Sequence, residues 1–234
     1  MHGSLSYAEK LELLQLEAEK ARRIKYNQFD AWFPESGPLR RELYPKHMEF
    51  FAAGVEHRER LFMAANRVGK TIAGGYEVTG HLTGEHKPWW QGRRFEKPVK
   101  VLAAGDTRST TRDIIQEKML GQFEDFGSGL IPKSRLVGSP SRVQGIPKAV
   151  EEVKVASAYG GNSVLMLRSY DQGRKIFQGF EADIIWLDEE VPQDIYAEAL
   201  IRTMTTGGML IMTFTPLQGL TPLVVDFMET AGMI

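Results

Sequence analysis

The segment from residue 64 to residue 72 has the spacing of a phosphate-binding loop. It consists of Ala64, Ala65, Asn66, Arg67, Val68, Gly69, Lys70, Thr71 and Ile72, and it matches G-x-x-x-x-G-K-[ST] except that alanine replaces the first glycine. In such a loop, backbone N–H groups surround the phosphates of a nucleotide, and the lysine reaches the outer phosphates. The threonine hydroxyl binds Mg²⁺. We therefore predict that Lys70 contacts phosphate and that Thr71 is a metal ligand.

Two carboxylates follow an apolar run in the second half of the chain. Residues 184–187 are Ile, Ile, Trp and Leu, and Asp188 and Glu189 come directly after them. Open α/β sheets bind ligands at the carboxyl ends of their strands, where both side chains would lie. We expect Asp188 to hold Mg²⁺ and Glu189 to act as the general base that deprotonates an attacking water. The adjacent pair favours hydrolysis of ATP with mechanical output.

Strands that alternate with helices must position these two motifs. Strands are predicted at residues 61–65, 99–105, 182–187 and 209–214, and helices at residues 71–82, 109–120 and 194–204. Continuous apolar runs are typical of parallel strands that are covered on both faces. The predicted fold is an α/β P-loop NTPase of the RecA-like (ASCE) branch, with a mostly parallel sheet and helices on both faces.

Three further segments lie outside this alternation. A helix with one apolar stripe is predicted at residues 5–26, where we expect it to pack at the periphery of the body. Residues 127–147 are rich in Gly, Ser, Pro and Arg and predict a loop or insertion. A hairpin is predicted between residues 153–158 and 163–170, with its turn at Gly160, Gly161 and Asn162.

The composition limits the classes of protein and partner. The hydrophobic share of 42% and the charged share of 25% are those of a globular domain, and the absence of cysteine excludes disulfides and thiolate metal sites. Twenty-nine basic and thirty acidic residues give a net charge of -1, so any contact with nucleic acid must be local. No apolar run approaches the roughly 20 residues of a membrane span, and we expect a cytoplasmic protein.

From about residue 44 to residue 228, the chain resembles the ATPase part of the large terminase subunit, the genome-packaging motor of tailed double-stranded-DNA phages. The motifs that carry the resemblance are the loop at residues 64–71, residues 173–180, the Asp-Glu strand and residues 213–216, in the family's order and at similar spacing. The resemblance implies that Tyr44, Pro45 and His47 recognise adenine, that Arg67 contacts the γ-phosphate, and that Thr213 and Thr215 belong to a coupling motif. The strand that carries this motif is expected to lie between the strand before the phosphate loop and the Asp-Glu strand.

The same resemblance implies the cofactors, partners and organisation of the protein. ATP and Mg²⁺ are the expected cofactors. The expected partners are double-stranded viral DNA, the small terminase subunit and the portal protein of the procapsid, on which the subunits assemble into a ring in the host cell cytoplasm. Residues 1–43 are expected to be an N-terminal helix and linker, and residues 44–234 the motor domain. The family's nuclease carboxylates would lie beyond residue 234, so no nuclease activity is expected here.

Several alternatives stay open at this point. A helicase-like motor shares both nucleotide motifs but needs a second RecA-like domain, and a scaffold that binds nucleotide without turnover would not need the Asp-Glu pair. Basic clusters at residues 93–100 and 133–148 are candidates for contacts with DNA phosphates. One of Arg108, Arg112, Arg135 or Arg142 is a candidate arginine finger for a neighbouring subunit. His81 and His86 are expected to be solvated rather than metal ligands.

Overall fold

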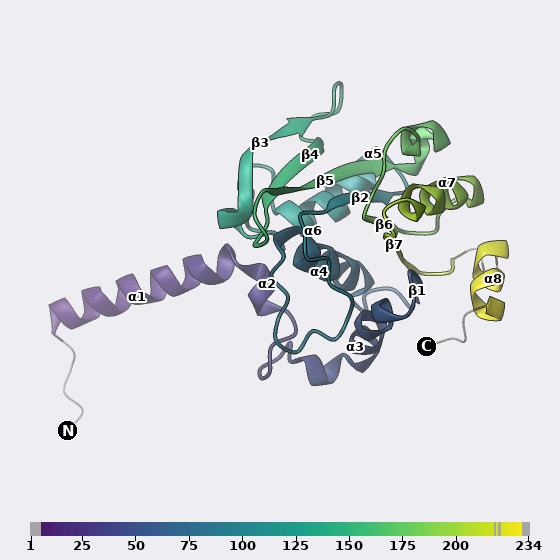
Figure 1. The fold of residues 1–234 in the computed structure, drawn as a ribbon. Helices are drawn as coiled ribbons and strands as arrows, with labels where there is room; N and C mark the ends of the chain where they lie inside the picture. The colour runs from purple at the N-terminus through teal and green to yellow at the C-terminus, as the bar shows by residue number, and fades with distance from the viewer. Residues whose placement is uncertain (1–5, 218, 220, 231–234) are drawn as a thin grey trace.

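The computed structural model describes residues 6–217, 219 and 221–230, and in this part of the chain seven strands form a single sheet (Figure 1). The strands are β1 (Glu59–Met63), β2 (Lys100–Gly105), β3 (Leu136–Arg142), β4 (Val150–Ala156), β5 (Asn162–Ser169), β6 (Ile184–Asp188) and β7 (Met209–Phe214). Their order is β1-β7-β6-β2-β5-β4-β3; the first five are parallel, and β4 and β3 run antiparallel to their neighbours. The predicted α/β architecture with a mostly parallel sheet is confirmed.

Helices cover both faces of this sheet. The α-helices are α1 (Tyr7–Lys25), α2 (Gln28–Ala31), α3 (Pro45–Ala52), α4 (Lys70–Thr83), α5 (Arg108–Thr110), α6 (Glu117–Leu120), α7 (Gln193–Met204) and α8 (Pro222–Thr230). Between α5 and α6 lies a π-helix, η3 (Thr111–Gln116), and short 3₁₀ turns are η1 (Arg41–Leu43), η2 (Ala53–Val55), η4 (Lys133–Arg135), η5 (Tyr170–Gln172) and η6 (Arg174–Phe177).

Alternate residues of the central strands belong to two separate cores. On β6, Trp186 packs in the core that includes residues of α3 and α4, whereas Leu187 packs in the core that includes residues of α7 and α8. All residues of β6 and β7 are buried, as expected for strands with both faces covered. Because β1, β7, β6, β2 and β5 are parallel, their carboxyl ends lie at one edge of the sheet.

Helix α4 lies unusually close to the middle of the sheet. A Cβ atom added to Gly74 would be 2.4 Å from the indole Nε1 of Trp186 on β6, so no other residue fits there without movement. The close approach fixes the amino end of α4 over the ends of β6 and β7. The sequence motif that begins this helix is thereby held against the motif that ends β6.

One prediction about the body of the molecule is incomplete, and two are wrong. Residues 127–147 contain the 3₁₀ turn η4 and the strand β3, which is an edge strand with mostly exposed residues and therefore has no apolar pattern. Helix α1 does not pack on the body: it has no buried residue and projects away from the sheet in Figure 1. His81 is not solvated, because it lies fully buried under the sheet with Phe95 and Trp90 around it.

The first 43 residues also contribute to the core. Phe29 stacks on Tyr76 of α4 with ring centroids 4.4 Å apart, and Phe33 is 1% exposed in the same cluster. The domain boundary after residue 43 stays a prediction. Among the described residues, no helix has the length and apolar character needed to cross a membrane.

Candidate functional site

The loop between β1 and α4 has a backbone that few residues adopt. Gly69 has φ 90°, and a Cβ atom there would lie 3.2 Å from the Nε2 atom of His47. Glycine therefore serves both the left-handed turn and the close approach of His47. Arg67 also has a positive φ, 64°, although it is not glycine. Such conformations concentrate at functional sites because the surrounding structure must hold them in place.

Lys70 connects this loop to the end of β7. Its Nζ donates to the carbonyl oxygen of Ala65 at 2.7 Å and to the Oγ1 of Thr215 at 2.8 Å. The Thr215 hydroxyl in turn donates to the Oδ1 of Asn66 at 2.8 Å. Burial lowers the pKa of Lys70, while Glu189 and Asp188 oppose that effect. The ammonium group is thus held at the mouth of the loop by neutral oxygens that a phosphate can replace.

Asp188 lies at the centre of a hydroxyl network. The Oγ1 of Thr213 donates to its Oδ1 at 2.5 Å, and the Oγ1 of Thr71 lies 3.0 Å from its Oδ2. Trp186 donates from Nε1 to the same Thr213 hydroxyl at 2.8 Å. Burial raises the pKa of Asp188 to about 7; hydrogen bonds from Thr213 and Thr71 lower it, and the charge of Glu189 raises it further. The site therefore holds a carboxylate whose charge the protein alone compensates poorly.

The oxygen atoms around Asp188 suit a hard divalent cation. Mg²⁺ is commonly bound through one or two carboxylates and hydroxyl groups together with phosphate oxygens. Thr71 and Asp188 supply a hydroxyl and a carboxylate that already lie within 3.2 Å of one another. Both residues predicted as metal ligands are thus together, and their donor atoms fit magnesium.

Glu189 extends beyond β6 in a strained conformation. Its φ is 70°, and its backbone N–H donates to the carbonyl oxygen of Thr213 at 3.0 Å. The buried hydroxyl of Tyr170 donates to the carbonyl oxygen of Asp188 at 2.9 Å and lies 3.4 Å from that of Glu189. Burial raises the pKa of Tyr170 well above its ordinary value, so this hydroxyl keeps its proton. Tyr170 was missed as a site residue because a tyrosine at the end of a predicted strand belongs to no recognised motif.

An apolar cavity of about 490 Å³ lies beside the loop. It is lined by residues of α3, β1, the loop and α8, among them His47, Phe62, Val68, Phe227 and Met228. Burial lowers the pKa of His47, so its ring is neutral near pH 7. The wall made by α8 was not predicted from the sequence, in which the strand at residues 209–214 is the last expected element.

The structure brings most of the predicted site residues together, but not all of them. Lys70, Thr71, Asp188, Thr213 and Thr215 form one network at the ends of β1, β7 and β6. Strand β7 lies between β1 and β6, as the resemblance implies for the strand with the coupling motif.

Three predicted residues lie apart from this network. The ring of Tyr44 packs edge-on against Phe33, and neither Tyr44 nor Pro45 lines the apolar cavity. Arg67 is exposed, and its side chain makes no hydrogen bond or ion pair with the described residues. Their roles in nucleotide binding stay predictions.

Comparison with known proteins decides the family. The model of the family "Terminase large subunit, T4likevirus-type, N-terminal" matches residues 61–232. The chain belongs to this family. It is 34% identical over 246 residues to the large terminase subunit of Salmonella phage P22, covering 97% of this chain and 47% of that protein. The chain thus spans about half the length of this relative.

A solved structure agrees with the family at the level of the fold. The large terminase of a thermophilic bacteriophage superposes with a TM-score of 0.51 at 12% sequence identity, over 88% of this chain and 42% of that one. The chain therefore has the fold of the amino-terminal part of a terminase large subunit. The network around Lys70 and Asp188 lies inside the region that the family model matches.

Proposed function

We propose that this chain binds ATP with Mg²⁺ and hydrolyses it to ADP and phosphate, as the motor part of a terminase large subunit. Hydrolysis would drive double-stranded viral DNA into a procapsid. The observation that carries this proposal is the network in which Lys70 and Thr71 at the start of α4 contact Thr215 and Asp188 at the ends of two neighbouring strands. A phosphate-binding lysine and a metal-binding carboxylate must meet in this way for hydrolysis.

Each side chain of the network has a role in this proposal. Lys70 would exchange the Ala65 carbonyl and the Thr215 hydroxyl for phosphate oxygens, because an anion is a stronger acceptor for an ammonium group. Thr71 and Asp188 would hold Mg²⁺, which supplies positive charge to the phosphates when bound. Glu189 would accept a proton from the attacking water, and Tyr170 would hold the backbone that directs Glu189.

The nucleoside would occupy the apolar cavity beside the loop. His47 and Phe62 form an edge-on aromatic pair with ring centroids 4.9 Å apart on one wall of the cavity, and a purine can pack against these rings. In this proposal, Tyr44 and Pro45 support His47. Arg67 contacts the γ-phosphate. Thr215, which contacts both Lys70 and Asn66, would report the loss of that phosphate to the rest of the protein.

The proposed partners follow from the family. A packaging motor acts on double-stranded DNA, and we propose that a ring of these subunits assembles on the portal protein and receives DNA from the small terminase subunit. A helicase-like motor and a scaffold without turnover are the alternatives. They differ from the packaging motor in their response to duplex DNA and in whether ATP is hydrolysed at all.

A DNA-stimulated ATPase assay on the chain tests this proposal. The wild type should hydrolyse ATP, and duplex DNA should raise the rate. Asp188→Asn should lose nearly all turnover, whereas Asp194→Asn, an exposed carboxylate at the start of α7, should keep it. Absence of hydrolysis by the wild type with and without DNA would favour the scaffold. Stimulation by single-stranded DNA alone would favour the helicase-like motor.

A further inference from the structure

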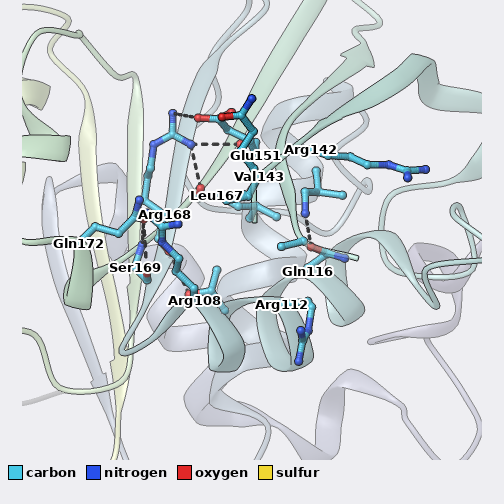
Figure 2. A pocket seen from close by; sticks show the side chains of 14 residues that line it. Arg108, Arg112, Gln116, Arg142, Val143, Glu151, Leu167, Arg168, Ser169 and Gln172 are labelled. Atoms are coloured by element: carbon cyan, nitrogen blue, oxygen red, sulfur yellow. Dashed lines mark hydrogen bonds and ion pairs between the residues drawn. The ribbon is translucent and has the colours of Figure 1, made fainter. Parts of the chain in front are cut away.

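A second cavity, which is polar, opens at the same edge of the sheet, on the far side of β2 from the phosphate loop. Its volume is about 490 Å³, and its walls come from α5, η3, the start of β4 and the ends of β3 and β5. Figure 2 shows Arg108, Arg112, Arg142 and Arg168, which line this arginine pocket, at different places around it. The π-helix η3 supplies Arg112, and π turns within helices occur frequently at functional sites.

The arginine pocket concentrates positive charge in a chain that is almost neutral. Four arginines and one glutamate line it, whereas the whole chain has a net charge of -1. A cavity lined by charges of one sign focuses the electrostatic potential and attracts ions of the opposite sign. The feature that distinguishes this pocket from the nucleotide site is therefore an excess of guanidinium groups.

Two of the four guanidinium groups have no carboxylate partner among the described residues. Arg112 forms a two-pronged pair with Asp113, and Arg168 pairs with Glu151 at 3.5 Å. By contrast, the side chains of Arg108 and Arg142 make no hydrogen bond or ion pair in this part of the chain. The guanidinium carbon of Arg142 lies 5.0 Å from the centre of the Phe123 ring, a contact that leaves its N–H groups available.

The chemistry of the walls favours the backbone of duplex DNA. A guanidinium group binds two oxygens of a phosphodiester at once, and spaced arginines fit successive phosphates. None of the described lining residues is aromatic, so an unpaired base would find no ring on which to stack. The pocket also lacks a glycine-rich loop that could surround a triphosphate with backbone N–H groups.

We propose that the arginine pocket binds phosphates of the double-stranded DNA backbone, with Arg108 and Arg142 as the principal contacts. The inference goes beyond the proposed function and rests on it only for the choice of DNA as the source of the phosphates. Ser169 and Gln172 line the pocket, and Tyr170 between them contacts the backbone of Asp188. One short segment thus joins the phosphate contacts to the carboxylates of the nucleotide site.

The test measures binding of a fluorescently labelled DNA duplex by fluorescence anisotropy over a range of salt concentrations. Each lost phosphate contact lowers the slope of log K against log salt by about 0.9, so R108Q/R142Q should lower it by about 2. The affinity should fall about tenfold or more. The matched control is R22Q/R23Q, which removes the same charge from exposed positions on α1 and should keep the wild-type slope.

Further arms distinguish the outcomes. The single variants R108Q and R142Q should each lower the slope by about 1, which keeps the test valid if the double variant does not fold. Equal slopes for the pocket and control variants, or no binding by the wild type, would overturn the proposal. Displacement of DNA by ATP from a Lys70→Ala variant would also overturn it, since the pocket would then bind nucleotide phosphates. ATP turnover is measured separately, so failure of the proposed function is distinguishable from failure of this inference.

Discussion

Helix α4 carries two buried polar clusters, one at its amino end and one around its middle, that differ in how their charges are compensated. At the amino end, Lys70 and Thr71 face the ends of β7 and β6, where Asp188 is 2% exposed. Further along the helix, Glu77 is fully buried and pairs with Arg60 of β1 through two hydrogen bonds. Both clusters are charged and out of water, yet only the first lies at a sheet edge where a ligand can enter.

The pKa values of Asp188 and Glu77 are shifted in opposite directions, and this difference distinguishes a ligand site from a structural pair. Burial raises the pKa of Asp188 to about 7, and its hydroxyl partners only partly offset this. Burial also acts to raise the pKa of Glu77, but Arg60 and His81 outweigh it and hold the pKa below its ordinary value. Glu77 therefore already has its cation within the fold. Asp188 has no cation of comparable effect among the described residues. This agrees with a metal site in which the neighbouring Thr71 hydroxyl is a second oxygen ligand.

The largest effect is expected when the proposed general base beside Asp188 is removed. Glu189→Gln should bind ATP and hydrolyse it about 10² to 10⁴ times more slowly, the range for loss of a general base. Glu190→Gln is the matched control and should retain the wild-type rate. Single-turnover rates measure the effect, and a Glu189→Gln rate within a factor of about three of the wild type would contradict the role.

In the cluster of Glu77 and Arg60, a substitution should mainly lower stability and not turnover. Glu77→Gln leaves the buried guanidinium of Arg60 without its counter-charge and should lower the free energy of unfolding by about 3–5 kcal/mol. Glu49→Gln removes an exposed carboxylate paired with Lys46, and its effect should stay below about 1 kcal/mol. Urea denaturation provides both values. Similar losses in the two variants would show that the buried pair is not specially stabilising.

The contact between Tyr170 and the Asp-Glu backbone gives a smaller, more specific effect. Tyr170→Phe removes the hydrogen bond to the carbonyl oxygen of Asp188, so Glu189 loses part of its orientation. We expect kcat to fall about tenfold while KM for ATP changes little, because a hydrogen bond of this kind contributes about 1–1.5 kcal/mol. Tyr159→Phe, at a half-exposed tyrosine on a turn, is the control. A rise in KM with unchanged kcat would indicate a role in binding instead.

The last effect concerns the pH dependence of stability beside the Glu77 cluster, where the ring of His86 packs against that of His81 with centroids 4.8 Å apart. Burial, assisted by the charges of His81 and Arg94, lowers the pKa of His86 to about 3. The unfolded chain has an ordinary histidine pKa of about 6.5, so between these values it binds a proton that the folded chain does not. Stability should therefore fall as the pH drops below about 6.5, by up to about 1.4 kcal/mol per pH unit for this residue.

The variant His86→Gln tests whether His86 causes this loss of stability at low pH. Unfolding free energies of the variant and the wild type, measured by urea denaturation between pH 7 and pH 4, should differ in slope by about one proton. Glu77 and His81 titrate in both proteins, so their contributions cancel in the comparison. Parallel curves would show that His86 is protonated in the folded state, in conflict with its burial.

The sequence predicted the elements that carry the nucleotide motifs because those elements have strong local patterns. Strand β7 was predicted with its observed bounds, and α4 within one residue at each end. Strand β7 is a nearly continuous apolar segment that follows two glycines, and α4 lies between Gly69 and Gly84. The meeting of Lys70 and Thr71 with Asp188 could be predicted because parallel strands place their carboxyl ends at one edge.

The remaining features depend on contacts that no local pattern reveals. Strand β3 contains Gly138 and Pro140 and is mostly exposed, so its pairing with β4 shows only in the folded sheet. His81 was expected in water, but the helix turns it under the sheet beside Glu77. Of the four arginines of the arginine pocket, Arg108 and Arg112 lie four residues apart, but Arg142 and Arg168 are far from them in the sequence. The pairing of β2 with β5, together with that of β5 with β4 and of β4 with β3, brings them to one cavity.

The central claim is that the loop before α4 holds the phosphates of a nucleotide through Lys70. Calorimetric titration with ATP and Mg²⁺ tests it most directly, with Lys70→Ala compared against Lys154→Ala, which removes an exposed lysine on β4. We predict saturable binding by the wild type and by Lys154→Ala, and loss of most of the affinity in Lys70→Ala. Equal affinity in all three proteins would contradict the account, because the nucleotide phosphates would then lie somewhere other than this loop.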